Sequence, residues 1–364
     1  MGLKMNLAMV SGWNKIQSWF SQAQATVTEE KLQDIPVAVK MKLEKIIDQL
    51  PLPSSYVTTV ESAIAQELKH WETEKDANRL VILGSPMNEI DDLIRNSFPN
   101  EKLKAVRVIY PFEKLEVREK PARITQELKS AIEAIKITDQ NEKIIMVIPN
   151  LEQYFLRCIG GWEGIIWLRE QIVNSPNYFW LIGCNHWSWK FLDHVCQLNA
   201  YLEETVMIPQ LNAEEIKSWL KPVANTFIPE TETKPSAFFW DNLASLSLGN
   251  IQVARQLWLQ SIQMSVSEEE EALKLINPSF PKLPILAASD RYILHSLLLH
   301  GKMKRSSLAL SLGEKEEDIQ ARIQILLRAE LIDRQQEALM VNPLFYPSIK
   351  QELNQNNFLI GEDA

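Results

Sequence analysis

Glycine is scarce in this chain, with 11 residues among 364, or about 3% against a typical ~7%. Binding phosphates through several glycine-rich loops requires bare backbone N–H groups at many turns, so the low count disfavours that class. Cysteine is also rare, and the three residues Cys158, Cys184 and Cys196 are more typical of a reducing cytosol than of a secreted disulfide scaffold. No run approaches the ~18 apolar residues of a membrane-spanning helix. We therefore expect a cytoplasmic protein without a transmembrane segment.

Tryptophan, by contrast, is abundant, with 11 residues. Such a number indicates large buried aromatic anchors, or exposed ones kept for a partner. The hydrophobic share of 46% and the charged share of 23% are those of a globular protein and exclude disorder, collagen and coiled-coil fibres. The net charge of −9 disfavours nonspecific binding to nucleic acid by the chain as a whole, although a local basic patch stays compatible with it.

Short apolar runs alternate with helical patterns between residues 56 and 210. The runs predict strands over 79–84, 105–110, 143–148, 178–183 and 204–208. Helical periodicity predicts helices over 56–75, 88–96, 122–135 and 163–173. Strands that alternate with helices at this spacing indicate an α/β fold with a parallel, three-layer sheet.

The residues on either side of this region are helical in pattern. We predict an N-terminal helical segment and linker over 1–55, a small all-helical module over 211–265 and an interdomain linker over 266–288. Residues 289–364 show three helices, a hairpin and a closing helix, which is the order of a winged helix.

An apolar stripe marks the N-terminal segment. Its residues recur at spacings of three to four and include Trp13, Ile16 and Phe20, which together with Trp19 are candidates for binding a partner. The stripe predicts a helix that docks on its own protein. Contact with a protein partner is the first alternative, and contact with a membrane surface is disfavoured because only two lysines accompany the stripe.

Polar segments follow three of the predicted strands, namely 84–89, 149–152 and 183–189, and the segment Gly249-Asn250-Ile251-Gln252 lies in the helical module. An α/β core, a helical lid and a C-terminal winged helix, in this order, resemble an AAA+-like P-loop ATPase of the origin-recognition-like or STAND branches. The resemblance covers roughly residues 56–350. It implies a P-loop-NTPase-like sheet with a lid and a winged helix, and it implies nucleotide contacts at those four segments.

The first segment departs from the family. A working P-loop reads Gly-x-x-x-x-Gly-Lys-Ser/Thr, because backbone N–H groups wrap the phosphates and the lysine reaches the β and γ oxygens. Here Gly84, Ser85 and Pro86 begin the turn, no lysine follows, and Glu89 leads a first helical turn with two aspartates. Proline lacks an N–H group, and carboxylates repel phosphate at a helix N-terminus. We therefore predict that phosphate binding is lost at this turn.

The other three segments depart in the same direction. Pro149 replaces the family's metal-binding aspartate, followed by Asn150 and by Glu152, which we interpret as a solvated residue at a helix start. Asn185 lies at the position of the polar sensor, where it either senses nucleotide or satisfies backbone groups at the strand end. In the lid motif Gly-x-x-Arg the arginine is replaced by Gln252, and the nearest arginine is Arg255.

These departures predict a catalytically inactive AAA+/STAND-like scaffold or regulatory subunit that binds protein partners or forms homo- or hetero-oligomers, with an active ATPase homologue as one candidate partner. We predict neither enzymatic activity nor a metal or cofactor. Two alternatives stay open: a sensor that binds ATP or ADP without hydrolysing it, and a DNA-associated regulator.

The DNA alternative depends on one basic cluster of the predicted winged helix, Lys302, Lys304 and Arg305. The predicted recognition helix starts in an acidic stretch, over 314–318, whereas a DNA-reading helix usually presents cations to the groove. We therefore expect this domain to dock protein and not nucleic acid.

Two further patterns invite chemistry. Trp187 and Trp189 would share a face in an extended segment, where an exposed pair would form an interface hot spot, although core tryptophans are the more common case. Cys184-x-His186 and His194-x-Cys196 contain zinc-type ligands. A pair two residues apart on a helix diverges by about 200°, so we expect structural cysteines and no zinc.

Overall fold

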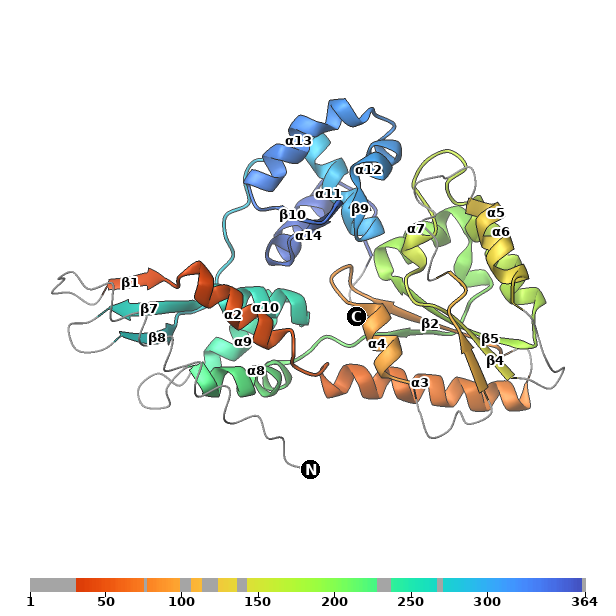
Figure 1. The fold of residues 1–364 in the computed structure, drawn as a ribbon, viewed down its shortest axis with the longest axis horizontal. Helices are drawn as coiled ribbons and strands as arrows, with labels where there is room; N and C mark the ends of the chain where they lie inside the picture. The colour runs from red at the N-terminus through yellow and green to blue at the C-terminus, as the bar shows by residue number, and fades with distance from the viewer. Residues whose placement is uncertain are drawn as a thin grey trace. The chain divides into compact units, whose positions relative to one another are not determined.

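The computed structural model describes residues 31–74, 77–98, 106–112, 124–135, 143–227, 237–266 and 271–361 (Figure 1). The chain forms two compact units. The large unit contains residues 54–210 and 282–364, and the small unit contains residues 1–53 and 211–281. The N-terminal stripe with Trp13, Ile16, Trp19 and Phe20 lies outside the described residues.

A parallel sheet forms the centre of the large unit. Its strands are β2 (Arg79–Gly84), β3 (Val106–Ile109), β4 (Lys143–Ile148), β5 (Tyr178–Asn185) and β6 (Thr205–Met207), in the spatial order β3-β4-β5-β2-β6. Strands β2, β4 and β5 are continuous apolar runs, buried along almost their whole length, as expected for strands covered on both faces. Gly84 pairs with Asn185, so the ends of β2 and β5 lie side by side.

Helices cover both faces of this sheet. They are α3 (Ser54–Thr73), α4 (Ile90–Asn96), α5 (Ile124–Glu133), α6 (Glu163–Asn174) and α7 (His186–Cys196), with short 3₁₀ turns η3 (Leu151–Gln153) and η4 (Leu198–Ala200). The connection from β2 to β3 runs along the sheet in one direction, and the connections from β3 to β4, β5 and β6 run in the other. Because such crossovers are right-handed, α4 lies on one face and α5, α6 and α7 on the opposite one, as Figure 1 shows. The predicted three-layer α/β fold is confirmed.

The C-terminal part of the large unit contains four α-helices and a small antiparallel sheet. Its elements are α11 (Ala288–His300), β9 (Met303–Lys304), α12 (Arg305–Leu312), α13 (Glu316–Arg328), β10 (Ile332–Gln335), β11 (Ala338–Val341), η5 (Pro343–Phe345) and α14 (Tyr346–Gln355). The sheet order is β10-β11-β9. We call these elements, residues 288–355, the C-terminal module. Helix α11 of the module packs against α7 and η3 of the α/β part.

The small unit corrects two predictions. It contains β1 (Lys31–Asp34), α2 (Val37–Ile47), α8 (Ala213–Phe227), α9 (Ala237–Leu246), α10 (Ile251–Gln260), β7 (Ile262–Val266) and β8 (Glu271–Leu275). Residues 31–34 were predicted as helix and are a strand that pairs with β7. The predicted linker likewise contains β8, which pairs with β7. Both assignments are wrong because pairing with distant residues overrides the local pattern.

Asparagine side chains cap two helices of the small unit. Asn212 forms a reciprocal capping box with Glu215 at the start of α8, and Asn250 accepts from the amides of Gln252 and Val253 at the start of α10. In the large unit, Asn88 does not cap α4 but accepts a hydrogen bond from the amide of Ser85. Within the described ranges, no helix is both long and apolar enough to cross a bilayer.

Candidate functional site at the carboxyl end of the parallel sheet

The turn after β2 uses its backbone donors internally. The Ser85 amide donates to Asn88 Oδ1 at 2.7 Å. The Met87 amide donates to Ser85 Oγ at 3.3 Å, and the Asn88 amide donates to Ser85 O at 2.9 Å. Pro86 has no N–H group to offer. At positions 85–88, every backbone N–H group that is present already donates within the turn. None of them is left to bind a phosphate, as the backbone N–H groups of a P-loop do.

The helix that follows this turn presents acidic and apolar side chains. Counted from Gly84 by the P-loop spacing, the glycine, lysine and hydroxyl positions are Glu89, Ile90 and Asp91. Ile90 is 1% exposed, and it lies so close to Gly183 of β5 that a side chain there would collide with it. The position of the phosphate-binding lysine is thus part of the hydrophobic core.

The segment after β4 corrects the interpretation of Glu152. Pro149 is buried, and Asn150 caps η3 without a side-chain hydrogen bond. Glu152 is only 7% exposed, so it is not the solvated residue that we predicted. Its Oε2 accepts a hydrogen bond from the Asn185 amide at 3.2 Å, because β4 and β5 are neighbours whose ends meet at this edge of the sheet. The carboxylate therefore supports the sheet edge from within.

Asn185 uses its backbone and side-chain groups inside the chain. Its Oδ1 accepts from the Ser188 amide at 2.9 Å and caps α7. Its Nδ2 donates to the carbonyl oxygen of Leu299 in α11 at 3.0 Å, and Ser188 Oγ donates to the same oxygen. Of the two interpretations of Asn185, the structure shows the backbone-satisfying one, and it adds a contact with the C-terminal module that the sequence did not indicate.

The tail after α14 reaches the same edge of the sheet. His295 of α11 donates from Nε2 to the carbonyl oxygen of Leu359 at 2.8 Å, which holds the tail along the module. Gly361 is buried, and a Cβ atom there would lie 1.8 Å from the ring of His186. His186 Nδ1 in turn donates to the carbonyl oxygen of Gly84 at 2.8 Å. One chain of contacts thus links the C-terminal tail to the start of the turn after β2.

A second histidine joins the module to the α/β part. The Arg157 amide donates to His300 Nε2 at 3.3 Å, which matches the tautomer with its proton on Nδ1. His300 Nδ1 lies 3.4 Å from the carbonyl oxygen of Glu152. Sequence reasoning missed both His300 and Arg157, because an isolated histidine in an apolar helix carries no signal for its distant partner.

The tryptophan pair is buried, which corrects the exposed alternative. Trp187 is 0% exposed and Trp189 is 5% exposed. The segment after Asn185 is a helix and not an extended strand, and residues two apart on a helix do not share a face. Trp187 packs against His295 and Tyr346 of the module. Trp189 Nε1 donates to Asn199 Oδ1 at 2.7 Å.

The basic cluster of the module is largely matched by acidic and polar groups. Lys304 lies 3.9 Å from Glu337, and Arg305 forms an ion pair with Glu316 at 2.9 Å. Lys302 is exposed. Lys304 and Arg305 thus each have a carboxylate nearby.

The lid candidates belong to the small unit. Gln252 lies in the first turn of α10, where its amide donates to Asn250 Oδ1. Arg255 forms an ion pair with Asp48, the residue after α2, and its side chain is 15% exposed. The guanidinium group is thus already engaged within its own unit.

The zinc-type residues do not gather. Cys184 is fully buried, and burial, followed by the nearby Glu152 carboxylate, raises the pKa of its thiol well above the usual value. Cys196 is also buried, which raises the pKa of its thiol to about 11, whereas His194 is exposed. No group of three or more potential metal ligands occurs in the part of the chain that the structure describes. Thiols held in the neutral form are poor ligands and poor nucleophiles.

No family model and no curated protein matches this chain. Solved structures show distant likeness. The RuvB Holliday junction branch migration motor of Thermotoga maritima is 13% identical, with a TM-score of 0.30, and the match covers 80% of this chain and 94% of that one. Cdc6p from Pyrobaculum aerophilum is 12% identical, with a TM-score of 0.35 and coverage of 85% and 95%. The ORC2 protein of Aeropyrum pernix, in ADPNP–ADP complexes, is 9% identical, with a TM-score of 0.35 and coverage of 81% and 94%.

Proposed function

We propose that this chain is a catalytically inactive AAA+/STAND-like protein that acts as a scaffold or regulatory subunit for protein partners. The observation that carries the proposal is the use of polar groups at the carboxyl end of the parallel sheet. The turn at 85–88 bonds to itself, and Asn185 and Glu152 bond to each other, with Asn185 also bonded to the C-terminal module. A nucleotide would have to break these bonds before it found a donor.

The charge and the core around the turn support the same conclusion. Phosphoryl transfer depends on cations and backbone donors that stabilise the charge on the phosphates. Here Ile90 fills the lysine position as a core residue, while Glu89, Asp91 and Asp92 bring negative charge to the first turn of α4. The residues present therefore fit neither Mg²⁺–ATP nor its hydrolysis.

Exposed apolar side chains of the C-terminal module support docking to a protein. Leu310 of α12 is 46% exposed and Ile325 of α13 is 49% exposed. Helix α13 begins with three acidic residues, and the one basic cluster is partly paired with carboxylates. A surface with apolar residues and without a cationic face favours a protein partner over DNA.

Titration calorimetry with ATP and ADP, with and without Mg²⁺, tests the loss of nucleotide binding. Neither the full chain nor a variant that ends at Asn356 should show binding heat. The backbone N–H groups of the turn at 85–88 donate within the turn whether or not the tail is present. Micromolar binding by the full chain would overturn the proposal. Binding by the truncated chain alone would instead identify an ATPase-type site that the tail blocks.

Site-specific photo-crosslinking tests the protein-docking role. A crosslinking residue at position 310 or 325 should capture a discrete protein, which is a second copy in the homo-oligomer version of the proposal. The same group at Arg334, an exposed position on β10, is the matched control and should capture none. Equal capture at all three positions would contradict a specific surface. A mobility shift of DNA that weakens with rising salt would favour the DNA alternative.

A further inference from the structure

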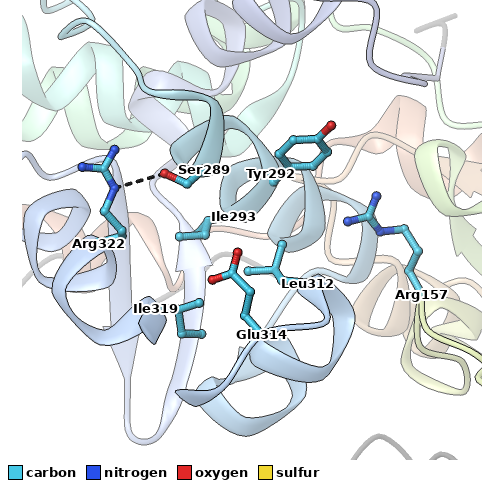
Figure 2. Close-up of a pocket in the computed structure, with 8 residues that line it drawn as sticks. All are labelled: Arg157, Ser289, Tyr292, Ile293, Leu312, Glu314, Ile319 and Arg322. Atoms are coloured by element: carbon cyan, nitrogen blue, oxygen red, sulfur yellow. Dashed lines mark hydrogen bonds between the residues drawn. The ribbon is translucent and has the colours of Figure 1, made fainter. Parts of the chain in front are cut away.

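A pocket of about 250 Å³ lies in the large unit, between the C-terminal module and Arg157 of the α/β part. Figure 2 shows its lining, with Arg322 and Ser289 at one end, Arg157 at the other and Glu314 between them. The lining consists of Arg157, Ser289, Tyr292, Ile293, Leu312, Glu314, Ile319 and Arg322. Neither the turn at 85–88 nor Asn185 contributes to the pocket, and Arg157 belongs both to the pocket and to the contacts described above.

The two arginines of the pocket differ in their electrostatic state. Arg322 Nη2 lies 3.0 Å from the buried Asp290 carboxylate, and its Nε donates to Ser289 Oγ at 3.2 Å. Arg157 reaches only Ser296 Oγ, at 3.4 Å, and its Nε is buried without a hydrogen-bond partner. No carboxylate of the described residues forms an ion pair with Arg157, and partial burial lowers the pKa of its guanidinium. A half-buried cation without a counter-ion is costly, and an anion would offset that cost.

Glu314 supplies the opposite charge. It lies in the turn between α12 and α13, is exposed, and forms no ion pair with any described residue. Figure 2 shows its carboxylate directed into the pocket between Ile293 and Leu312. The pocket thus has one cation, Arg157, and one anion, Glu314, that form no ion pair with another described residue. A ligand with several negative charges would be attracted by Arg157 and repelled by Glu314.

Three aliphatic side chains and the ring of Tyr292 complete the lining. Ile293 and Ile319 are each 1% exposed and form its apolar floor, together with Leu312. The volume of about 250 Å³ is below the ~300–1,000 Å³ of pockets for drug-sized ligands. The pocket therefore suits a ligand smaller than a drug-sized molecule.

We propose that this pocket binds a small zwitterion with an aliphatic body, of the class of a free aliphatic amino acid. Its carboxylate binds the Arg157 guanidinium, its ammonium group faces Glu314, and its side chain covers the isoleucine floor. Arginine suits this role because its planar fork binds a carboxylate through two parallel hydrogen bonds. The site is independent of nucleotide binding and goes beyond the proposed scaffold function.

Such a ligand would also strengthen the contact between the two parts of the large unit. Arg157 follows η3 in the α/β part, whereas the other lining residues belong to the C-terminal module. A molecule that binds both sides stabilises the docked arrangement relative to any opened or unfolded one. Ligand binding should therefore raise the midpoint of thermal unfolding.

Calorimetry and thermal unfolding with three related probes test the proposal on the full chain. L-Leucine carries both charges, 4-methylpentanoate lacks the ammonium group, and 3-methylbutylamine lacks the carboxylate. We expect leucine to bind most tightly and to raise the unfolding midpoint, and we expect each analogue to bind at least about tenfold more weakly, since each loses a charged contact.

Variants of Arg157 and Glu314 test which charged group of the ligand each residue binds. Arg157→Gln should weaken leucine and 4-methylpentanoate about tenfold or more, and Arg157→Lys should restore part of the affinity through its charge. Glu314→Gln should weaken leucine but not 4-methylpentanoate. Arg334→Gln and Glu317→Gln, two exposed positions outside the pocket, are matched controls and should bind like the unmodified chain. The proposal is overturned if leucine neither binds nor shifts the midpoint, or if it binds Arg157→Gln and the unmodified chain equally well.

Discussion

Asn185, Glu152 and His186 lie at the carboxyl end of the parallel sheet, and each of them bonds to its own chain. Asn185 caps α7 and holds Leu299, Glu152 holds the Asn185 amide, and His186 holds Gly84 O. Buried polar groups of this kind are costly to leave unsatisfied, at about 1–3 kcal/mol each. Their removal should therefore change stability and docking, and it should not change nucleotide affinity.

Substitution of Asn185 tests this at a single position. Asn185→Ala removes the cap and the donor to Leu299 O and should cost about 2 kcal/mol of unfolding free energy. Asn185→Asp keeps an acceptor for the cap but brings a carboxylate close to the Leu299 carbonyl oxygen and to Glu152, so it should cost more at neutral pH. Urea unfolding at pH 7 measures both. The matched control is Asn212→Asp at the exposed cap of α8, which should be nearly neutral because Asn and Asp cap equally well. Equal effects of Asp at the two caps would contradict the bond to Leu299.

Gly361 offers a steric test of the tail contact. Gly361→Ala would place a Cβ atom 1.8 Å from the His186 ring, and such overpacking costs typically about 1–3 kcal/mol. In a His186→Ala background the ring is gone, so the same glycine substitution should have little further effect. A double-mutant cycle of thermal unfolding measures this coupling. Additive effects would show that the tail does not touch His186.

The lowered pKa of His295 predicts that the free energy of unfolding depends on pH. Burial is the main cause that lowers its pKa from 6.5 to about 4. Between pH 6.5 and pH 4 the unfolded chain binds a proton at this residue and the folded chain does not. The contribution of His295 to the free energy of unfolding is therefore complete above pH 6.5. It decreases by about 3 kcal/mol as the pH falls to 4. His295→Gln, which keeps a donor toward Leu359 O, should lack this component. Urea unfolding between pH 7.5 and 4.5 measures the difference, and parallel profiles of the two proteins would contradict the prediction.

At the scale of helices and strands, the parallel sheet was predictable and the small unit was not. Strand β4 was predicted with its observed bounds, because a continuous run of Ile, Met and Val bounded by polar residues leaves few alternatives. Strand β1 was predicted as helix, since its partner β7 lies more than two hundred residues away and no local pattern encodes that pairing.

The candidate site was likewise predictable only in part. The departures from the resembled motifs at Gly84, Pro149 and Gln252 were visible in the sequence. The groups that occupy the sheet edge were not visible, because Leu299, His300 and Gly361 meet that edge only after the C-terminal module has docked. Glu152, which lies next to these contacts, was predicted as solvated and is buried.

The strand β1 gives a prediction at this scale. Leu32→Pro and Gln33→Pro each remove one backbone N–H group, and neighbouring N–H groups of a strand point to opposite sides, so one of the two substitutions removes a hydrogen bond to β7. That variant should raise amide exchange in β7 and leave β2 and β5 unchanged. Lys31→Ala, without an effect on the backbone, is the control. If neither proline variant affects β7, the N-terminal strand is not paired as described.

At the scale of the whole molecule, each unit joins segments that are far apart in the sequence. The small unit joins residues near the N-terminus, through β1 and α2, to the helices that follow the parallel sheet. The large unit joins the α/β part to the C-terminal module through hydrogen bonds, aromatic contacts and the tail. This second junction carries the central claim, namely that the chain itself occupies the edge of the sheet where a nucleotide would bind.

Residue-resolved hydrogen exchange, with and without Mg²⁺–ATP, tests that claim most directly. The amides of Arg157 and Asn185 are suitable reporters, because the first donates to His300 of the C-terminal module and the second to Glu152, at the edge that the module covers. We predict that both exchange slowly, that the truncation after Asn356 accelerates them, and that Mg²⁺–ATP leaves the exchange of the full chain unchanged. Fast exchange at both amides, or protection that appears only when Mg²⁺–ATP is added, would contradict the account.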